Sequence, residues 1–137
     1  MLRTIGKLED EIGPQCYAQR TMQGNHIAKH LLITELVVIF AYFGVDKFVS
    51  PILWIGWIPL WMDGLLGMPK ELWLHIIGAF EIITALLILV PFRRARQIGT
   101  ILAAGQLVGI FTQVGVNDVG ARDLAILLSD LALMAML

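Results

Sequence analysis

The chain has 137 residues, of which 58% are hydrophobic and only 15% are charged. Soluble domains carry about 25% charged residues, so this composition is typical of a membrane protein. The net charge of −1 gives no indication of the basic patch that nucleic-acid binding requires. We therefore expect an all-α integral-membrane protein with no nucleic-acid partner.

A polar arm comes first in the chain, over residues 1–26. It carries acidic and basic side chains and lacks an apolar run, so we expect it to lie in the cytoplasm with at most a short amphipathic helix. The next segment, residues 27–47, is apolar and has the length of about 20 residues that a membrane helix needs. It is the first predicted span.

The connection between the first and second spans, residues 48–69, is apolar and rich in tryptophan. Prolines interrupt it, and Pro59 would bend or split any helix that formed there. Trp54, Trp57 and Trp61 have the i, i+3, i+7 spacing of one helix face. We expect an interfacial or re-entrant cap on the outer side. Its tryptophans form either an aromatic belt at the lipid headgroups, a lid over a lipid-like ligand or a docking face for another subunit.

Three further spans follow this connection. Residues 72–92 form the second span, residues 97–116 form the third, and residues 121–137 form the fourth and shortest. Glycines in the third span allow close contact between helices. The short links 93–96 and 117–120 require antiparallel neighbours, so the expected architecture is an up-down four-helix bundle in the membrane.

The distribution of basic residues predicts how these spans are oriented. Basic residues concentrate in the arm and in the link before the third span, and cytoplasmic segments of membrane proteins carry the excess of Lys and Arg. We therefore expect a multi-pass protein of the cell membrane with both termini in the cytoplasm. The cytoplasmic basic residues are Arg3, Lys7, Arg20, Lys29, Arg93, Arg94 and Arg96, and the outer ones are Lys47, Lys70 and Arg122.

Polar residues recur on one helical face of each predicted span. Residues seven apart share a face of a helix, which groups Glu35 with Tyr42 and Asp123 with Asp130. A carboxyl group at the centre of a bilayer costs about 2.5–3.5 kcal/mol unless it is compensated. We therefore expect these faces to turn inward and form a polar seam, made of Glu35, Tyr42, Glu81, Gln106 and Asp130.

The acids of this seam have no basic partner in the chain at their predicted depth, because Lys47 and Arg122 fall near the outer end. We expect protonated or proton-sharing acids that bond to Gln106 and Tyr42, since burial disfavours the ionised form. Three alternatives remain open. The seam is a purely interhelical contact worth about 0.6–2 kcal/mol per contact, a proton or quinone site, or a pairing with a basic residue of a partner protein.

Motifs for nucleotides, zinc proteases and haem are absent from the sequence. The single cysteine, Cys16, excludes an intrachain disulfide and a four-cysteine zinc site. His26 and His30 have the i, i+4 spacing of a metal pair and are weak metal candidates. They flank Lys29 at the predicted membrane edge, which favours interfacial histidines, so we predict no metal site in this chain.

Two segments resemble the small four-helix DoxX-like membrane proteins. They are FGVDKF at residues 43–48 and IGAFEIITALLIL at residues 77–89, which contains Glu81; Asp123 also matches an acid that is typical of the last span of that family. The resemblance covers residues 28–137. It implies a four-helix membrane fold and a role as a small subunit of a membrane oxidoreductase, such as a quinone-linked thiosulfate oxidoreductase.

The arm segment EDEIGPQCYAQRTMQGNHIAKH, residues 9–30, is similar to the start of a small accessory subunit of archaeal ammonia monooxygenase, a copper membrane enzyme. This resemblance implies copper in partner subunits and no cofactor in this chain. Both resemblances predict a non-catalytic accessory subunit that contacts lipids and larger membrane-protein subunits. The alternative is a stand-alone quinone- or proton-handling protein, and a channel or carrier is less favoured because four spans without a repeat leave little room for a pore.

Overall fold

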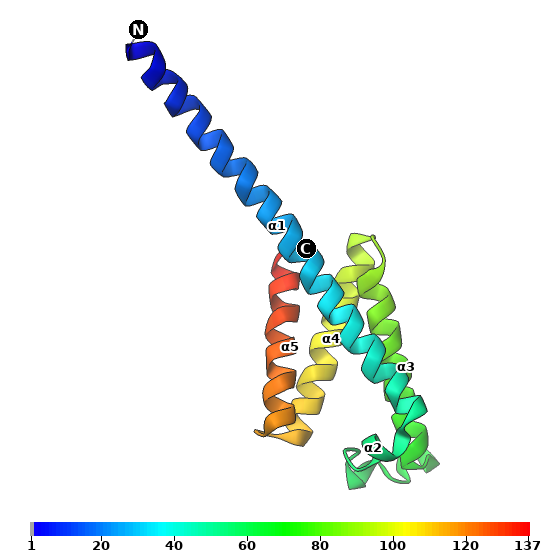
Figure 1. The fold of residues 1–137 in the computed structure, drawn as a ribbon. Helices are drawn as coiled ribbons and strands as arrows, with labels where there is room; N and C mark the ends of the chain where they lie inside the picture. Colours follow the sequence, from blue (N-terminus) through cyan, green and yellow to red (C-terminus); the bar gives the residue numbers. More distant parts are fainter. Residues whose placement is uncertain (1) are drawn as a thin grey trace. The chain divides into compact units, whose positions relative to one another are not determined.

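The computed structural model describes the backbone of residues 2–137 and the side chains of residues 24–137, and this part of the chain is helical without a strand (Figure 1). The all-α prediction is confirmed. Residues 1–31 and residues 32–137 form two separate units. The elements are α1 (Leu2–Val49), α2 (Pro51–Ile55), η1 (Leu60–Met62), η2 (Leu65–Gly67), α3 (Lys70–Leu89), α4 (Arg93–Val114) and α5 (Asp118–Ala135).

Helices α3 and α4 are long and apolar enough to cross a membrane. The most apolar window of 18 residues has a mean hydropathy of 2.2 in α3 and 1.3 in α4. These helices coincide with the second and third predicted spans, although α3 begins at Lys70 and α4 begins at Arg93. The predicted four-span topology also requires α1 and α5 to cross the membrane, and it stays a prediction.

Helix α1 begins at Leu2 and ends at Val49, so the predicted arm, residues 1–26, is helical throughout the part described. The prediction of a short helix there was wrong. A change from polar to apolar composition does not end a helix, because Lys, Gln and Glu are good helix formers. The helix ends before Pro51, since a residue that precedes proline avoids the helical conformation, and Ser50 has φ −127° and ψ 55°.

The link between α3 and α4 is shorter than the sequence suggested, because it consists of residues 90–92 and the arginines belong to α4. The side chain of Arg96 turns back towards the end of α3. Its Nε donates to the carbonyl of Ile88 at 2.9 Å, and its Nη2 donates to that of Val90 at 3.1 Å. The last carbonyls of a helix have no partner within the helix, so Arg96 caps α3.

Replacing Arg96 by alanine is expected to lower the free energy of unfolding by about 1.5–3 kcal/mol, because hydrogen bonds from a charged donor have this value. Arg94→Ala is the matched control, since it removes the same charge from an exposed position of the same turn. Denaturant unfolding in detergent micelles measures both variants. Equal losses for Arg94→Ala and Arg96→Ala would contradict the capping role.

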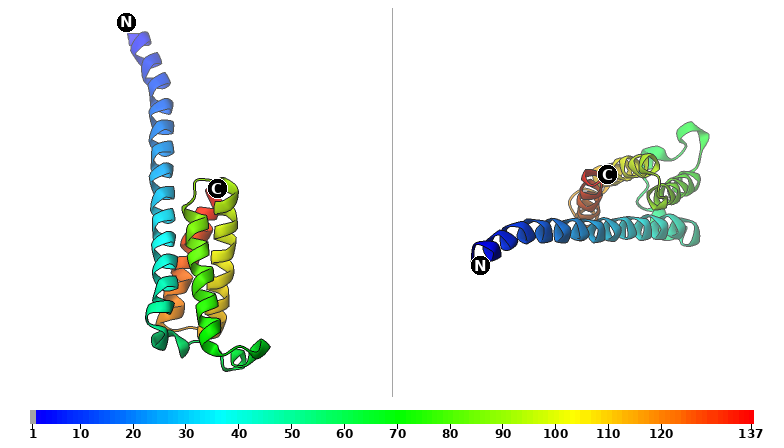
Figure 2. Two further views of the ribbon diagram at one scale, coloured as in Figure 1. Left: turned by 90° about the vertical axis from the view of Figure 1, so that its right-hand side faces the viewer. Right: turned by 90° about the horizontal axis from the view of Figure 1, so that it is seen from above.

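Within residues 32–137, α3 packs against α4 and α4 packs against α5 (Figure 2). The second half of α1 contacts α3 through glycines. A Cβ atom added to Gly44 would lie 2.9 Å from the carbonyl oxygen of Gly78, and one added to Gly78 would lie 2.9 Å from that of Gly44. The core between the helices contains Leu36, Phe40, Ala85, Ile88, Ala103, Leu107, Ile126 and Leu133, among others.

The tryptophan-rich connection folds into short helical turns and does not form one helix. Helix α2 ends at Ile55, and Pro59 precedes the separate turn η1. Trp54 therefore lies in α2 and Trp61 lies in η1, so the predicted single face of three tryptophans is wrong. The proline broke the helical spacing on which that prediction depended.

Candidate ligand cavity beneath the tryptophan-rich connection

A cavity of about 530 Å³ lies where α1, α3, α4 and α5 meet the tryptophan-rich connection. This volume falls within the range of about 300–1,000 Å³ that is usual for small-molecule sites. Aromatic side chains in the lining include Phe43, Trp54, Trp57 and Trp61. Aliphatic side chains include Ile39, Leu74, Ile77, Leu107, Ile110 and Ile126. The charged and amide side chains are Lys47, Glu81, Gln106, Gln113, Arg122 and Asp123.

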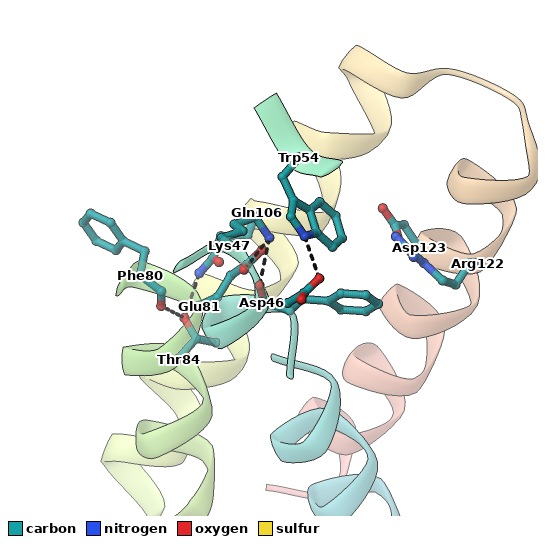
Figure 3. A network of polar contacts seen from close by, with 10 residues as sticks. Asp46, Lys47, Trp54, Phe80, Glu81, Thr84, Gln106, Arg122 and Asp123 are labelled. Carbon is teal, nitrogen blue, oxygen red and sulfur yellow. Dashed lines mark hydrogen bonds and ion pairs between the residues drawn. The ribbon is translucent and has the colours of Figure 1, made fainter. Parts of the chain in front are cut away.

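A buried ion pair between α1 and α3 forms part of the cavity wall (Figure 3). Nζ of Lys47 lies 2.6 Å from Oε2 of Glu81, and the two side chains are 7% and 4% exposed. The expectation that Glu81 has no basic partner in the chain was wrong. The antiparallel packing of α1 and α3 brings the last turns of α1 level with the middle of α3.

The surroundings of Lys47 help to compensate the removal of its charge from water. Its ammonium lies 4.4 Å from the centre of the Trp54 ring, a distance at which the negative face of the ring attracts a cation. It also donates to the carbonyl of Phe43 at 3.4 Å. A buried ion pair stabilises the fold only when such additional contacts offset the loss of hydration.

A second ion pair, formed by neighbours on α5, lies in the cavity wall. Arg122 Nη2 and Asp123 Oδ1 are 2.7 Å apart, with Asp123 buried and Arg122 partly exposed. The guanidinium of Arg122 lies 4.6 Å from the centre of the Phe43 ring, which connects α5 to α1. Lys47 and Arg122 thus both contact aromatic residues of the cavity, and each is balanced by a carboxylate.

The side chain of Trp54 joins the tryptophan-rich connection to α1. Its Nε1 donates to Oδ2 of Asp46 at 2.7 Å, and its ring meets the Phe43 ring edge-on with centres 5.4 Å apart. Trp57 and Trp61 also line the cavity and are 48% and 63% exposed. All three tryptophans therefore line the cavity, and two of them retain an outward surface.

Gln106 and Thr84 connect α4 to α3 beside the cavity. Nε2 of Gln106 donates to Oγ1 of Thr84 at 2.7 Å, and this hydroxyl donates in turn to the carbonyl of Phe80 at 2.8 Å. Because the Thr84 hydroxyl donates its one proton to the Phe80 carbonyl, it can only accept from Gln106. The amide of Gln106 is therefore oriented with its NH₂ group towards Thr84. The hydrogen bond expected from Gln106 to an acid is replaced by this one.

The structure separates the remaining members of the predicted seam. Tyr42 is 64% exposed, and Glu35 is exposed and accepts a hydrogen bond from Ser129 at 3.2 Å. Asp130 is fully buried and does not line the cavity, and neither of its oxygens has a hydrogen-bond partner in the described residues. Only Glu81 and Gln106 of the five seam residues meet at the cavity.

His26 and His30 are exposed residues of α1, in the unit of residues 1–31. Among residues 24–137 there is no group of three or more His, Cys, Asp or Glu side chains placed to hold a metal ion. The residues that could hold an organic ligand are those of the cavity. Sequence reasoning identified Glu81, Gln106 and the tryptophans for such a role, but it missed Lys47, Phe43 and the Arg122–Asp123 pair.

The cavity combines aromatic rings, aliphatic side chains and two neutralised ion pairs in a helical protein with two membrane-compatible helices. A mainly apolar lining with a few polar groups is usual for sites that bind small organic molecules. The DoxX-like and monooxygenase-subunit resemblances of the sequence stay predictions. No family model, no curated protein and no solved structure matches the chain.

Proposed function

We propose that this chain is an integral-membrane protein of a redox system and that it binds a quinone-class molecule in the cavity. The observation that carries this proposal is the buried Lys47–Glu81 pair in a wall that otherwise consists mainly of aromatic and aliphatic side chains. A quinone has a flat ring with two carbonyl oxygens and an apolar tail. Each part of this molecule has a chemical counterpart in the cavity.

The head group is the part of the ligand that we assign to the polar wall. An ammonium has three donors, and Lys47 uses one for Glu81 and one for the carbonyl of Phe43. The third is available for a quinone carbonyl. The ring would stack on the aromatic side chains, which favour offset or edge-on contact with ring centres 4.5–7 Å apart.

Filling the cavity tests this proposal. Gly109 lines the cavity, and a Cβ atom added there meets nothing within 4 Å, so Gly109→Phe should occupy the space without disturbing the helices. We expect it to weaken binding of a short-tailed benzoquinone at least ~10-fold, which corresponds to ~1.4 kcal/mol. The measurement is quenching of tryptophan fluorescence by the quinone, because Trp54, Trp57 and Trp61 line the cavity.

The matched control is Gly105→Phe, one turn earlier on α4. This position is exposed, also meets nothing within 4 Å and does not line the cavity. The control should bind the quinone as the unmodified protein does. Saturable quenching that is the same in both variants would place the quinone elsewhere, and no saturable quenching in the unmodified protein would overturn the proposal.

A second candidate function is that of an accessory subunit in a larger membrane oxidoreductase, of the quinone-linked DoxX type or of the copper monooxygenase type. The observation that favours it is the exposure of Glu35 and Tyr42 on α1, because an acid and a phenol on the outside of a membrane bundle suit protein contact better than lipid. Purification in mild detergent should recover larger subunits with this chain. Recovery of the isolated chain alone would contradict it.

A further inference from the structure

The outer face of α1 within residues 32–49 carries a stripe of exposed residues with one charge in it. Val38, Tyr42 and Val45 are 59%, 64% and 50% exposed, and Glu35 precedes them on the same side of the helix. In the described residues both ion pairs lie elsewhere, at Lys47–Glu81 and Arg122–Asp123. We call Glu35, Val38, Tyr42 and Val45 the α1 outer stripe.

Glu35 is only partly satisfied by the side chains that the structure describes, residues 24–137. A carboxylate accepts at about four lone-pair sites, and Glu35 receives one bond of 3.2 Å from Ser129 of α5. Ser129 is well inside α5, which runs from Asp118 to Ala135. If α5 crosses the bilayer, Glu35 faces the apolar layer, where an acid costs about 2.5–3.5 kcal/mol.

The surface beside the stripe has room for another helix. On α5, Ala121 and Ala125 precede Ser129 at steps of four residues, and both alanines are exposed. Small residues with this spacing let the backbone of a neighbouring helix approach closely. Helix α5 therefore offers a shallow surface next to the carboxylate of Glu35.

We propose that the α1 outer stripe binds a transmembrane helix of a different polypeptide, and that this helix carries a lysine or arginine level with Glu35. Charge complementarity is the basis for this occupant, because an acid that faces the apolar layer without a counter-charge is satisfied best by a cation. A second copy of the chain fits less well, since a two-fold contact would bring the two Glu35 side chains together. The inference rests on the accessory-subunit candidate and is independent of the quinone.

Photocrosslinking tests the occupant of the stripe. A benzophenone side chain placed at Val38 in native membranes should crosslink to one polypeptide, in a transmembrane segment that contains Lys or Arg. The matched control is the same group at Ile101 of α4, which is 61% exposed and should not reach that segment. Crosslinks from Val38 to lipid alone, to a second copy or to a segment without a basic residue would each overturn the proposal.

Charge variants then test the role of Glu35. Glu35→Lys should lower the yield of the Val38 crosslink at least ~10-fold, and reversal of the partner's basic residue to glutamate should restore it. Glu35→Gln, which keeps the size of the side chain, should give an intermediate yield and guards against a folding defect in Glu35→Lys. An undiminished crosslink in both variants would refute the charge pairing. Larger subunits that co-purify without a Val38 crosslink would leave the accessory role intact and overturn only this surface.

Discussion

Replacing Glu81 by alanine is expected to lower the free energy of unfolding by about 3–5 kcal/mol, because the substitution leaves the ammonium of Lys47 buried without a counter-charge. Lys47 is 5% exposed and Glu81 is 3% exposed, so solvent cannot replace the missing partner unless the helices move. Glu81→Gln should cost less than Glu81→Ala, since an amide oxygen still accepts from Lys47. Denaturant unfolding in micelles, followed by helical circular dichroism, measures these losses.

Two comparisons separate the loss of the pair from a general effect of removing an acid. Glu71→Ala removes an exposed acid from the first turn of the same helix and should cost less than ~1 kcal/mol, the usual effect of a charge at a helix end. The double variant Lys47→Met, Glu81→Leu should recover most of the stability, because apolar residues of similar volume replace buried ion pairs well. A double variant as unstable as Glu81→Ala would contradict this account of the pair.

The buried faces of α3 and α5 could be predicted from the sequence. The sequence predicts that the face of Glu81 turns inward, and Glu81 is buried together with Gly78, Thr84 and Ala85. The spacing of seven residues also placed Asp123 and Asp130 on one buried face of α5. In α3, small and hydroxyl-bearing residues surround Glu81, and such residues are usual where membrane helices pack against one another.

For α1 the same rule identified a face but assigned it to the wrong side. Glu35 and Tyr42 do share a face, and that face is exposed. The buried face contains Leu36 and Phe40. Lys47 is also buried and lies eleven residues after Leu36 and seven after Phe40, spacings that place all three on one face of the helix. This apolar stripe was the available signal for Lys47, whose long aliphatic stem can lie among apolar residues while its charge finds a partner.

The cavity could not be predicted, because periodicity within a helix says nothing about the register between helices. The pair Lys47–Glu81 joins residues 34 positions apart, and the contact of Arg122 with Phe43 joins α5 to α1. Such contacts depend on how far one helix is displaced along another. Between α1 and α3 that displacement is set by the close approach of Gly44 and Gly78.

The contact between these glycines therefore determines whether the ion pair and the cavity form at all. Gly78→Ala is expected to destabilise the protein by about 1–3 kcal/mol, the usual cost of overpacking, because the new methyl group would lie 2.9 Å from the backbone oxygen of Gly44. Backbone cannot yield as a flexible side chain does, so α1 and α3 must separate. The separation should also lengthen the Lys47–Glu81 contact and weaken any ligand bound beside it.

The control for this substitution is Gly105→Ala, since a Cβ atom at that position of α4 meets nothing within 4 Å. Alanine favours helix over glycine by about 0.8–1.0 kcal/mol, so the control should be neutral or stabilising. Gly78→Ala receives the same helix benefit, so the difference in stability between the two variants measures the interhelical contact. The register of the helices and the ion pair depend on each other. The triple variant Gly78→Ala, Lys47→Met, Glu81→Leu should therefore lose less free energy of unfolding than the sum of the losses of Gly78→Ala and of the double variant. Strict additivity would show that the glycine contact and the ion pair are independent.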